Sequence, residues 1–223
     1  FTQKGKSFWL RVYDIPEGSK ISKGRAIQNL VSIEQDDKVK AFICTQDLKD
    51  ENYINNHYVV MATKKGQVKK TSLEQYSRPR VNGINAITIR EGDELLEAKL
   101  TTGSSQVVLA VKSGKAIRFE ESKTRPMGRN ASGVRGIKLS HSSDEVVGMV
   151  AVNDLDTDIL VVSENGYGKR SKLEDYRITN RGGKGVKTLS VTEKTGNLVS
   201  IKNVIDSDDL MIINRSGIAI RLG

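Results

Sequence analysis

Residues 107–118 read Val-Val-Leu-Ala-Val-Lys-Ser-Gly-Lys-Ala-Ile-Arg, an apolar run followed by a polar turn that ends in glycine and then by a basic strand. Four further copies of the turn and strand occur along the chain, three of them also after an apolar run, and the turn glycines are 48 to 61 residues apart. The turn glycines are Gly5, Gly66, Gly114, Gly166 and Gly217. Self-similarity at such a period is typical of repeat architectures. The sequence therefore predicts a molecule built from packed copies of one unit.

Each repeat up to the fourth carries a second glycine, 17 to 19 residues after the first, that opens an alternating stretch such as residues 84–89. Alternation over about six residues indicates a strand. An acidic corner follows in three repeats, at residues 35–37, 91–94 and 143–145, and another apolar strand comes next. The pattern thus predicts four strands in each unit of about 50 residues.

A four-stranded sheet with one buried face cannot cover itself, so its copies have to pack side by side. Closing the copies into a ring removes most of the exposed strand edges. The pattern therefore favours an all-β, propeller-like disc, and a solenoid of stacked sheets is the alternative. The helix-like segments are short turns at residues 72–76 and 171–176.

We expect residues 1–223 to form a single domain. The expected units span residues 1–57, 58–106, 107–158 and 159–209, with a partial unit at residues 210–223. The chain would then enter in the middle of one unit and leave in the middle of another. We therefore expect a piece of a longer protein whose ring is incomplete at both ends. Pairing of the two end segments in one sheet is one way for such a ring to close.

The composition is basic, with 36 Lys and Arg against 27 Asp and Glu and a net charge of +9. A polyanion is the first partner to consider, and a merely well-solvated surface is the alternative. Cys44 is the only cysteine, which excludes an intrachain disulfide and favours a reducing compartment. Two distant histidines and one cysteine indicate neither a metal site nor a nucleophile–base pair. We expect no cofactor, no metal and no catalytic residue.

Basic residues recur after each apolar run and in the loop between the two glycines of each repeat. In a propeller these positions return at one rim, so their charges would sum to a positive belt, with the acidic corners elsewhere. Such a belt fits duplex DNA, whose backbone carries about one charge per 1.7 Å. For any single residue, solubility is the alternative. The candidate phosphate contacts are Lys64, Lys65, Lys69, Lys70, Arg78, Arg80, Lys115, Arg118, Arg129, Arg135, Lys169, Arg170, Arg181 and Lys184.

The stretch at residues 179–185, Thr-Asn-Arg-Gly-Gly-Lys-Gly, is distinctive. Its glycines would let the backbone approach a phosphate closely while Arg181 and Lys184 face the same anion. The alternative is a flexible connector. No base-reading pattern accompanies the cations, so any preference among sequences would come from the deformability of the DNA.

Five stretches of the chain are recognisable, namely Arg11-Val12-Tyr13-Asp14-Ile15-Pro16-Glu17, Gln35-Asp36-Asp37, Gly66-Gln67-Val68-Lys69-Lys70-Thr71, Gly133-Val134-Arg135-Gly136-Ile137 and Asn165-Gly166-Tyr167-Gly168-Lys169-Arg170. Through them the chain resembles a known family, the C-terminal domains of the DNA gyrase A subunit, over residues 1–223. The resemblance implies a six-bladed β-pinwheel, a propeller-like disc whose blades exchange strands. The hallmark box of that family, Gln-Arg-Arg-Gly-Gly-Lys-Gly, is matched best by residues 179–185, where Thr179 and Asn180 depart from it. We therefore expect the true box upstream of Phe1.

The resemblance implies a non-catalytic module that binds, bends and wraps duplex DNA on its basic outer rim. The parent enzyme would be an ATP-hydrolysing type II topoisomerase that supercoils DNA negatively in the bacterial cytoplasm, associated with the nucleoid. The implied partners are double-stranded DNA and, in a heterotetramer, the remainder of the gyrase A subunit together with the gyrase B subunit, with no membrane. The isolated domain is expected to be monomeric.

Three alternative functions remain open. The related domain of topoisomerase IV is one, although the clustered Arg-Gly-Gly-Lys-Gly at residues 181–185 favours gyrase. A protein-binding propeller is another, and it predicts no affinity for DNA at physiological salt. A propeller enzyme would need convergent carboxylates or histidines at the central channel.

Overall fold

The computed structural model describes residues 1–19, 21–214 and 216–223. Strands are the main regular elements of this part of the chain, and the helical elements are short. The turns predicted at residues 72–76 and 171–176 are confirmed as 3-10 helices. The helical elements are α1 (Glu51–Asn56) and the 3-10 turns η1 (Val12–Asp14), η2 (Ile27–Asn29), η3 (Leu73–Tyr76), η4 (Glu121–Lys123) and η5 (Leu173–Asp175).

The strands of the described residues form antiparallel sheets of four, four, three, two and two strands. The first four-stranded sheet has the order β5 (Leu95–Thr101), β2 (Tyr58–Thr63), β3 (Gln67–Ser72), β8 (Val134–Arg135). The second has the order β9 (Val146–Val152), β6 (Gln106–Val111), β7 (Lys115–Glu120), β12 (Val186–Lys187). The three-stranded sheet has the order β13 (Leu198–Val204), β10 (Asp158–Ser163), β11 (Gly168–Lys172). The ladders pair β1 (Lys6–Ser7) with β4 (Ile84–Asn85) and β14 (Leu210–Ile213) with β15 (Ala219–Leu222).

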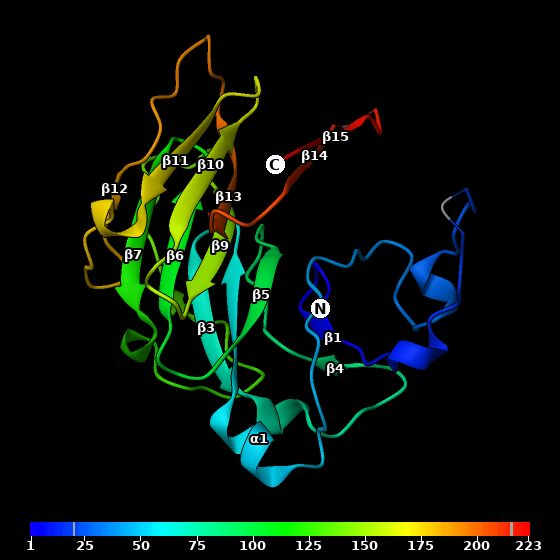
Figure 1. Cartoon of the computed structure of the whole chain (residues 1–223). Coiled ribbons are helices and arrows are strands. Elements are labelled where there is room, and N and C mark those ends of the chain that lie inside the picture. Colours follow the sequence, from blue (N-terminus) through cyan, green and yellow to red (C-terminus); the bar gives the residue numbers. More distant parts are fainter. Residues whose placement is uncertain (20, 215) are drawn as a thin grey trace.

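The sheets follow one another as an arc, with the β1–β4 ladder and the β14–β15 hairpin at its two ends (Figure 1). Strand β9 contacts both β5 and β13, so these three strands line the inner side of the arc. Strands β8 and β12 take the opposite, outer edge of their sheets. This arrangement is the propeller-like one predicted from the repeats and not a solenoid.

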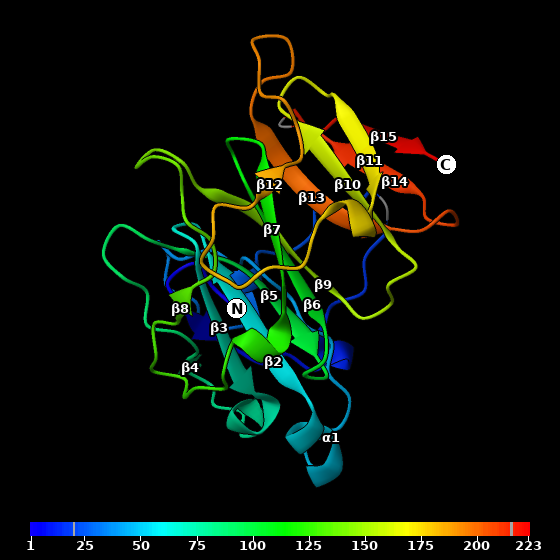
Figure 2. The ribbon, with the colours of Figure 1, turned by 90° about the vertical axis from the view of Figure 1, so that its left-hand side faces the viewer.

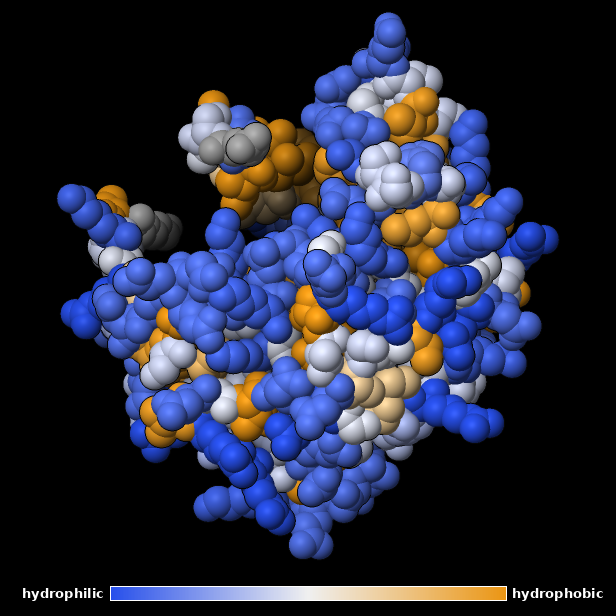
Figure 3. All heavy atoms as spheres, turned by 180° about the vertical axis from the view of Figure 1, so that it is seen from behind, coloured by the Kyte–Doolittle hydropathy of each residue, from blue (hydrophilic) through white to orange (hydrophobic). Residues whose placement is uncertain are grey.

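The two ends of the arc do not pair with each other in one sheet. The mode of ring closure in which the two end segments share a sheet is therefore not observed. Strand β1 pairs with β4, and β14 pairs with β15. Figure 3 shows the molecule from behind, where hydrophilic side chains cover most of the face and apolar ones gather at the hairpin end of the arc. The exposed apolar side chains of that hairpin are Met211, Ile213, Ile218, Ile220 and Leu222.

The outermost strand of each four-stranded sheet comes from the following repeat. Strand β8 pairs with β3 through Val134 opposite Val68, and β12 pairs with β7 through Val186 opposite Ala116. The prediction that one repeat supplies all four strands of its own sheet is therefore wrong. Strand exchange, which the family resemblance implied, is present instead. It ties each repeat to the one before it.

The apolar runs are continuous because both faces of each central strand are buried. In β2, Val59 and Met61 pack into one cluster with Leu73, whereas Val60 and Ala62 pack into the next with Leu109. Burying one such side chain stabilises the fold by roughly 1.5–3 kcal/mol. Among the described residues, the hydrophobic core therefore lies between neighbouring sheets, and its clusters combine side chains from consecutive repeats.

The second glycine of a repeat stands where the exchanged segment meets the preceding sheet. A Cβ atom on Gly133 would lie 2.7 Å from the carbonyl oxygen of Val68, and one on Gly185 would lie 2.4 Å from that of Ala116. Both glycines also have a positive φ, of 84° and 73°. Glycine is required at these points because any side chain would both strain the backbone and push the exchanged strand away.

We expect Gly133→Ala to lower the free energy of unfolding by about 2–4 kcal/mol, because backbone strain and steric overlap with Val68 act together. The matched control is Gly92→Ala, since Gly92 has a φ of 70° but open space around its Cβ position. Backbone strain alone should cost that variant about 1 kcal/mol. Urea unfolding followed by circular dichroism measures both. Equal losses would contradict the close approach at Gly133.

Candidate nucleic-acid interface

Three loops run along the outer edge of the arc, each between a 3-10 turn and the next exchanged strand. They span residues 77–83, 124–133 and 176–185, and we call them the crossing loops. Strands β12, β8 and β4, to which they lead, succeed one another from top to bottom along the left of Figure 2. Each exchanged strand thus brings the basic loop of its repeat to the same rim.

Backbone hydrogen bonds hold two of the crossing loops on the preceding sheet. The Met127 N–H donates to Lys70 O at 2.8 Å, and the Thr179 N–H donates to Arg118 O at 2.9 Å. Both acceptors lie on the outer strand of the preceding repeat, at equivalent positions. The path of the loop is therefore fixed by main-chain contacts.

An arginine in each of these two loops fastens it to the preceding exchanged strand. Arg129 Nη1 donates to Asn85 O at 3.3 Å, and Arg181 Nη1 donates to Arg135 O at 3.1 Å. Asn85 and Arg135 are the second residues of β4 and β8, so the contact recurs from one repeat to the next. Both arginines are half-buried. These two predicted phosphate contacts thus position their loops.

The crossing loops, the exchanged strands and the last residue of η4 expose a row of cations, which we call the basic rim. The predicted residues Arg78, Arg80, Arg135 and Lys184 are exposed in it. The rim also contains exposed residues that were not selected as contacts, namely Lys123, Arg125, Arg177 and Lys187. Lys187 takes the position in β12 that Arg135 takes in β8, so alignment of the repeats could have found it. Charges of one sign in a row reinforce the field along it.

Lys69 does not reach the surface. Its side chain is fully buried, and Nζ donates to Ala86 O and to Arg129 O, each at 2.5 Å. Burial and the nearby positive charge of Arg129 lower the pKa of Lys69 to about 8. The prediction that Lys69 contacts phosphate is contradicted by this enclosure, because the ammonium is surrounded by protein.

Lys70 and Arg118 are also buried, because they stand between neighbouring sheets and bind the following repeat. Lys70 Nζ lies 2.9 Å from Glu121 Oε1 and 4.2 Å from the centre of the Tyr58 ring. Arg118 Nη1 donates to Leu173 O at 2.8 Å and to Tyr176 O at 3.1 Å. Their predicted role as phosphate contacts is likewise contradicted.

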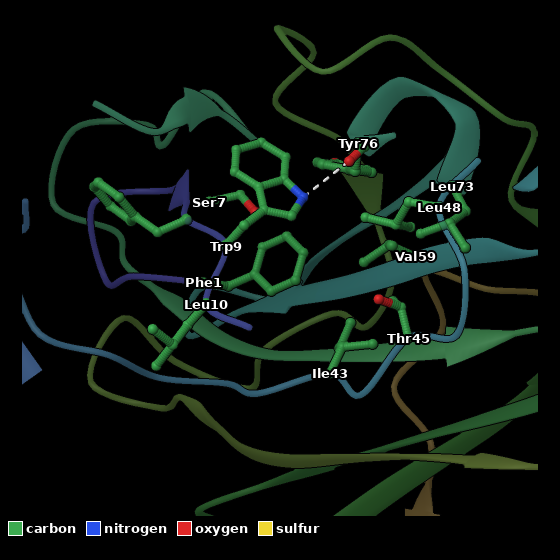
Figure 4. Close-up of a pocket in the computed structure, with 11 residues that line it drawn as sticks. Phe1, Ser7, Trp9, Leu10, Ile43, Thr45, Leu48, Val59, Leu73 and Tyr76 are labelled. Atoms are coloured by element: carbon green, nitrogen blue, oxygen red, sulfur yellow. Dashed lines mark hydrogen bonds between the residues drawn. The ribbon is translucent and has the colours of Figure 1, made fainter. Parts of the chain in front are cut away.

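The position four residues after Gly66 and after Gly114 thus joins consecutive repeats, and we call it the inter-repeat position. Trp9 occupies it after Gly5, and its Nε1 donates to Tyr76 O at 3.0 Å (Figure 4). Phe1, Leu73 and Tyr76 line a cavity of about 100 Å³ beside this contact. The role of Trp9 was missed because an indole does not match a lysine or an arginine in a sequence pattern.

The turn lysines lie beside the acidic corners. Lys64 Nζ is 2.6 Å from Glu94 Oε1 and 3.7 Å from Glu145 Oε2 of the next repeat, and the hydrogen bond to Glu94 raises the pKa of Lys64. Lys65 Nζ donates to Ser142 O at 3.2 Å, and Lys115 Nζ donates to Ser140 Oγ at 3.2 Å. The expectation that the acidic corners lie away from the belt is wrong for these turns.

Those corners have a structural role. The Asp93 carboxylate accepts the Lys65 N–H at 2.9 Å, and the Asp144 carboxylate accepts the Ser113 N–H at 3.1 Å. An acceptor at this place fixes the turn that precedes the glycine.

Lys169 and Arg170 lie on β11, the edge strand of the three-stranded sheet. Lys169 is exposed. Arg170 is also exposed, but its guanidinium lies between two carboxylates, with Nε 2.6 Å from Asp158 Oδ2 and Nη2 2.5 Å from Asp206 Oδ1. The structure therefore places these two predicted contacts at a sheet edge and outside the crossing loops.

The glycine-rich stretch at residues 179–185 packs against the preceding repeat. The Gly182 N–H donates to Gly136 O at 2.6 Å, and Lys138 N–H donates to Gly183 O at 2.8 Å. Gly185 approaches the backbone of Ala116, as described above. The alternative of a flexible connector does not fit these contacts. The glycines serve the crossing itself, and Lys184 remains exposed beside them.

In the part of the chain that the structure describes, no group of three or more His, Cys, Asp or Glu side chains is arranged to hold a metal ion. None of the helices in that part has the length and apolar character that crossing a membrane requires.

Comparison with known families gives matches along the whole chain. A family model described as the DNA gyrase C-terminal domain, beta-propeller, matches residues 1–46, 57–102, 106–153 and 157–205. The DNA gyrase A subunit of Staphylococcus epidermidis is 44% identical over 223 residues, which are 100% of this chain and 24% of that protein. Its counterpart in Staphylococcus aureus is 44% identical over 224 residues, 100% of this chain and 25% of that protein. The chain spans about a quarter of the length of these relatives.

Two solved structures have the same fold. The C-terminal domain of DNA topoisomerase IV superposes with a TM-score of 0.87 at 25% identity, covering 100% of this chain and 68% of that one. The DNA gyrase A C-terminal domain superposes with a TM-score of 0.81 at 23% identity, covering 99% of this chain and 69% of that one.

Proposed function

This chain belongs to the family of DNA gyrase C-terminal domains, and from that membership we propose that it is a non-catalytic module that binds duplex DNA along the basic rim. The observation that supports the proposal is the recurrence of exposed cations on three consecutive crossing loops, at Arg80, Arg125 and Lys184 among others. A duplex presents phosphates along a continuous path. Cations that return once in each repeat can therefore neutralise several phosphates of one duplex.

We further propose that the duplex bends as it follows the rim, because the sheets that carry the rim are arranged in an arc. Phosphate contacts fix the position of a duplex without reading its bases, so preferences would come from how easily a sequence bends. In the parent enzyme this bending would contribute to ATP-dependent negative supercoiling, with the rest of the gyrase A subunit and the gyrase B subunit as partners in the bacterial cytoplasm.

Topoisomerase IV is the second candidate for the parent enzyme, because the solved C-terminal domain of that enzyme superposes with a TM-score of 0.87. Gyrase is favoured because the relatives at 44% identity are gyrase A subunits. Either parent would use the rim for the same contacts with phosphates.

The salt dependence of binding tests the proposal. If six to ten phosphates are neutralised, log affinity should fall with log salt concentration with a slope of about −5 to −9. Electrophoretic mobility shifts on duplexes of about 40 and 150 base pairs in a salt series measure the slope, and the longer duplex detects contacts beyond one short site. A slope near zero, or no binding at physiological salt, would favour a protein-binding propeller instead.

A further inference from the structure

The crossing loop at residues 124–133 meets the exchanged strand β4, and the crossing loop at residues 176–185 meets the exchanged strand β8. We call these two contacts the earlier and the later junction. A buried backbone carbonyl oxygen receives its hydrogen bond from a different kind of donor in each. In each junction the carbonyl oxygen just after the exchanged strand, that of Ala86 or of Gly136, points into protein and needs a donor. In the later junction the Gly182 N–H supplies it, at 2.6 Å from Gly136 O. Gly182 has a φ of 83°, a conformation that glycine adopts without strain.

The earlier junction has Asn130 where the later one has Gly182, since both stand 16 residues after the turn glycine of their repeat. No residue other than glycine has a positive φ among the described residues, so Asn130 does not take the conformation of Gly182. Ala86 O instead accepts from Lys69 Nζ at 2.5 Å and from the Tyr76 hydroxyl at 3.2 Å. The donor in this junction is a side chain.

Lys69 also reaches the crossing loop itself. Its Nζ donates to Arg129 O at 2.5 Å, one residue before Asn130. Its counterpart in the next repeat, three residues after the turn glycine, is the buried Ile117. A lysine is thus present where the loop lacks the glycine, and an apolar residue is present where the loop has it.

We propose that Lys69 is a positioning residue of the basic rim: its buried ammonium replaces a backbone N–H and holds the crossing loop at residues 124–133 on the preceding repeat. The loop fixed in this way carries the exposed Arg125 and follows directly on Lys123. Burying an ammonium without a carboxylate partner is unfavourable, so its two carbonyl acceptors are the compensation that keeps it in place. The part of the proposal that concerns DNA rests on the proposed function.

The test uses the whole chain and replaces the lysine donor of the earlier junction with the glycine of the later one. K69M removes the ammonium and keeps an unbranched side chain, and K69M/N130G adds the glycine of the later junction. K99M is the control, because Lys99 lies on β5 at the inner side of the arc and its loss changes the net charge equally. Hydrogen exchange of the Met127 and Ala131 amides reports on the loop without DNA.

In K69M we expect these amides to exchange at least tenfold faster, and duplex affinity to fall about five- to tenfold, because Arg125 and Lys123 lose their fixed positions. K69M/N130G should restore both the protection and the affinity, and K99M should change neither. Restored protection in the double variant also decides the matter if K69M alone does not fold.

Three results would overturn the proposal. The first is unchanged protection of the loop amides in K69M. The second is a K69M/N130G variant whose loop amides stay unprotected. The third is an equal loss of duplex affinity in K69M and K99M, which would show that only the total charge matters. Absence of duplex binding by the wild-type chain would refute the proposed function, while the exchange data would still decide whether Lys69 positions the loop.

Discussion

The variant R80E/R125E/K184E should bind a duplex of about 40 base pairs roughly a thousandfold more weakly than the wild-type chain at 0.1 M salt. It reverses one exposed cation on each crossing loop of the basic rim. Each lost phosphate contact removes about 0.9 units from the slope of log affinity against log salt, which is nearly tenfold in affinity at 0.1 M salt. Repulsion between the new carboxylates and phosphate adds to that loss.

The matched control is K49E/K194E/K202E, which changes the net charge equally at exposed residues outside the basic rim. We expect it to weaken binding less than about fivefold, because distant charges are screened at this ionic strength. The slope should fall by about three in the rim variant and stay unchanged in the control. Circular dichroism confirms that both variants fold. Similar losses in the two variants would show that total charge, and not the rim, determines binding.

The repeats and the propeller-like arrangement could be predicted because glycine turns and apolar runs are local signals. Strand exchange has no local signal of that kind. Strands β8 and β12 are two residues long, and they pair with partners more than 60 residues earlier in the chain. Only the crossing glycines marked them, since Gly133 and Gly185 meet a neighbouring backbone too closely for a side chain.

The basic rim could be predicted as a region, but which of its cations are buried and which are exposed could not. Lys69, Lys70 and Arg118 follow turn glycines on strands, where alternation suggests an exposed face. That face does not exist here, because both sides of β3 and β7 pack against neighbouring repeats. The crossing loops were the better guide, since Arg78, Arg80 and Lys184 are exposed on them. The phosphate contacts of these exposed residues remain a prediction.

The buried cations Lys70 and Arg118 make equivalent contacts, which we call joints, between consecutive repeats. Lys70 and Arg118 occupy the same inter-repeat position, and both contact the first residue of the next 3-10 turn, Glu121 in one case and Leu173 in the other. Lys70 binds a carboxylate side chain, whereas Arg118 reaches backbone carbonyls of the next repeat and also donates through Nε to Gln106 Oε1 of its own repeat at 2.7 Å. An arginine is longer and has more donors than a lysine, so it can replace a carboxylate contact with carbonyl contacts. The two joints are therefore exchangeable in principle.

We expect E121L to lower the free energy of unfolding by about 3–5 kcal/mol, because it leaves the Lys70 ammonium buried without its counter-ion. Glu121 is fully buried, and its carboxylate also accepts from Thr101 Oγ1 at 2.8 Å and from the Ser105 N–H at 3.2 Å. A loss of this size is a large part of the stability of an ordinary domain. Urea unfolding followed by circular dichroism measures it. The exposed E74L, in the preceding 3-10 turn, is the control and should change stability by less than about 0.5 kcal/mol.

The double variant K70R/E121L places the residue types of Arg118 and Leu173 in the preceding pair of repeats, where Tyr58 stands in the position of Gln106. The arginine should donate to the backbone carbonyls of the η4 turn, as Arg118 does to those of Leu173 and Tyr176. We expect this variant to recover stability to within about 1–2 kcal/mol of the wild-type chain, the remainder reflecting the lost acceptor of Ser105. If E121L were as stable as the wild-type chain, the ion pair would not hold the repeats together. If K70R/E121L were no more stable than E121L, a cation at the inter-repeat position would depend on its particular partner. The contacts of Lys70 and of Arg118 would then not be equivalent.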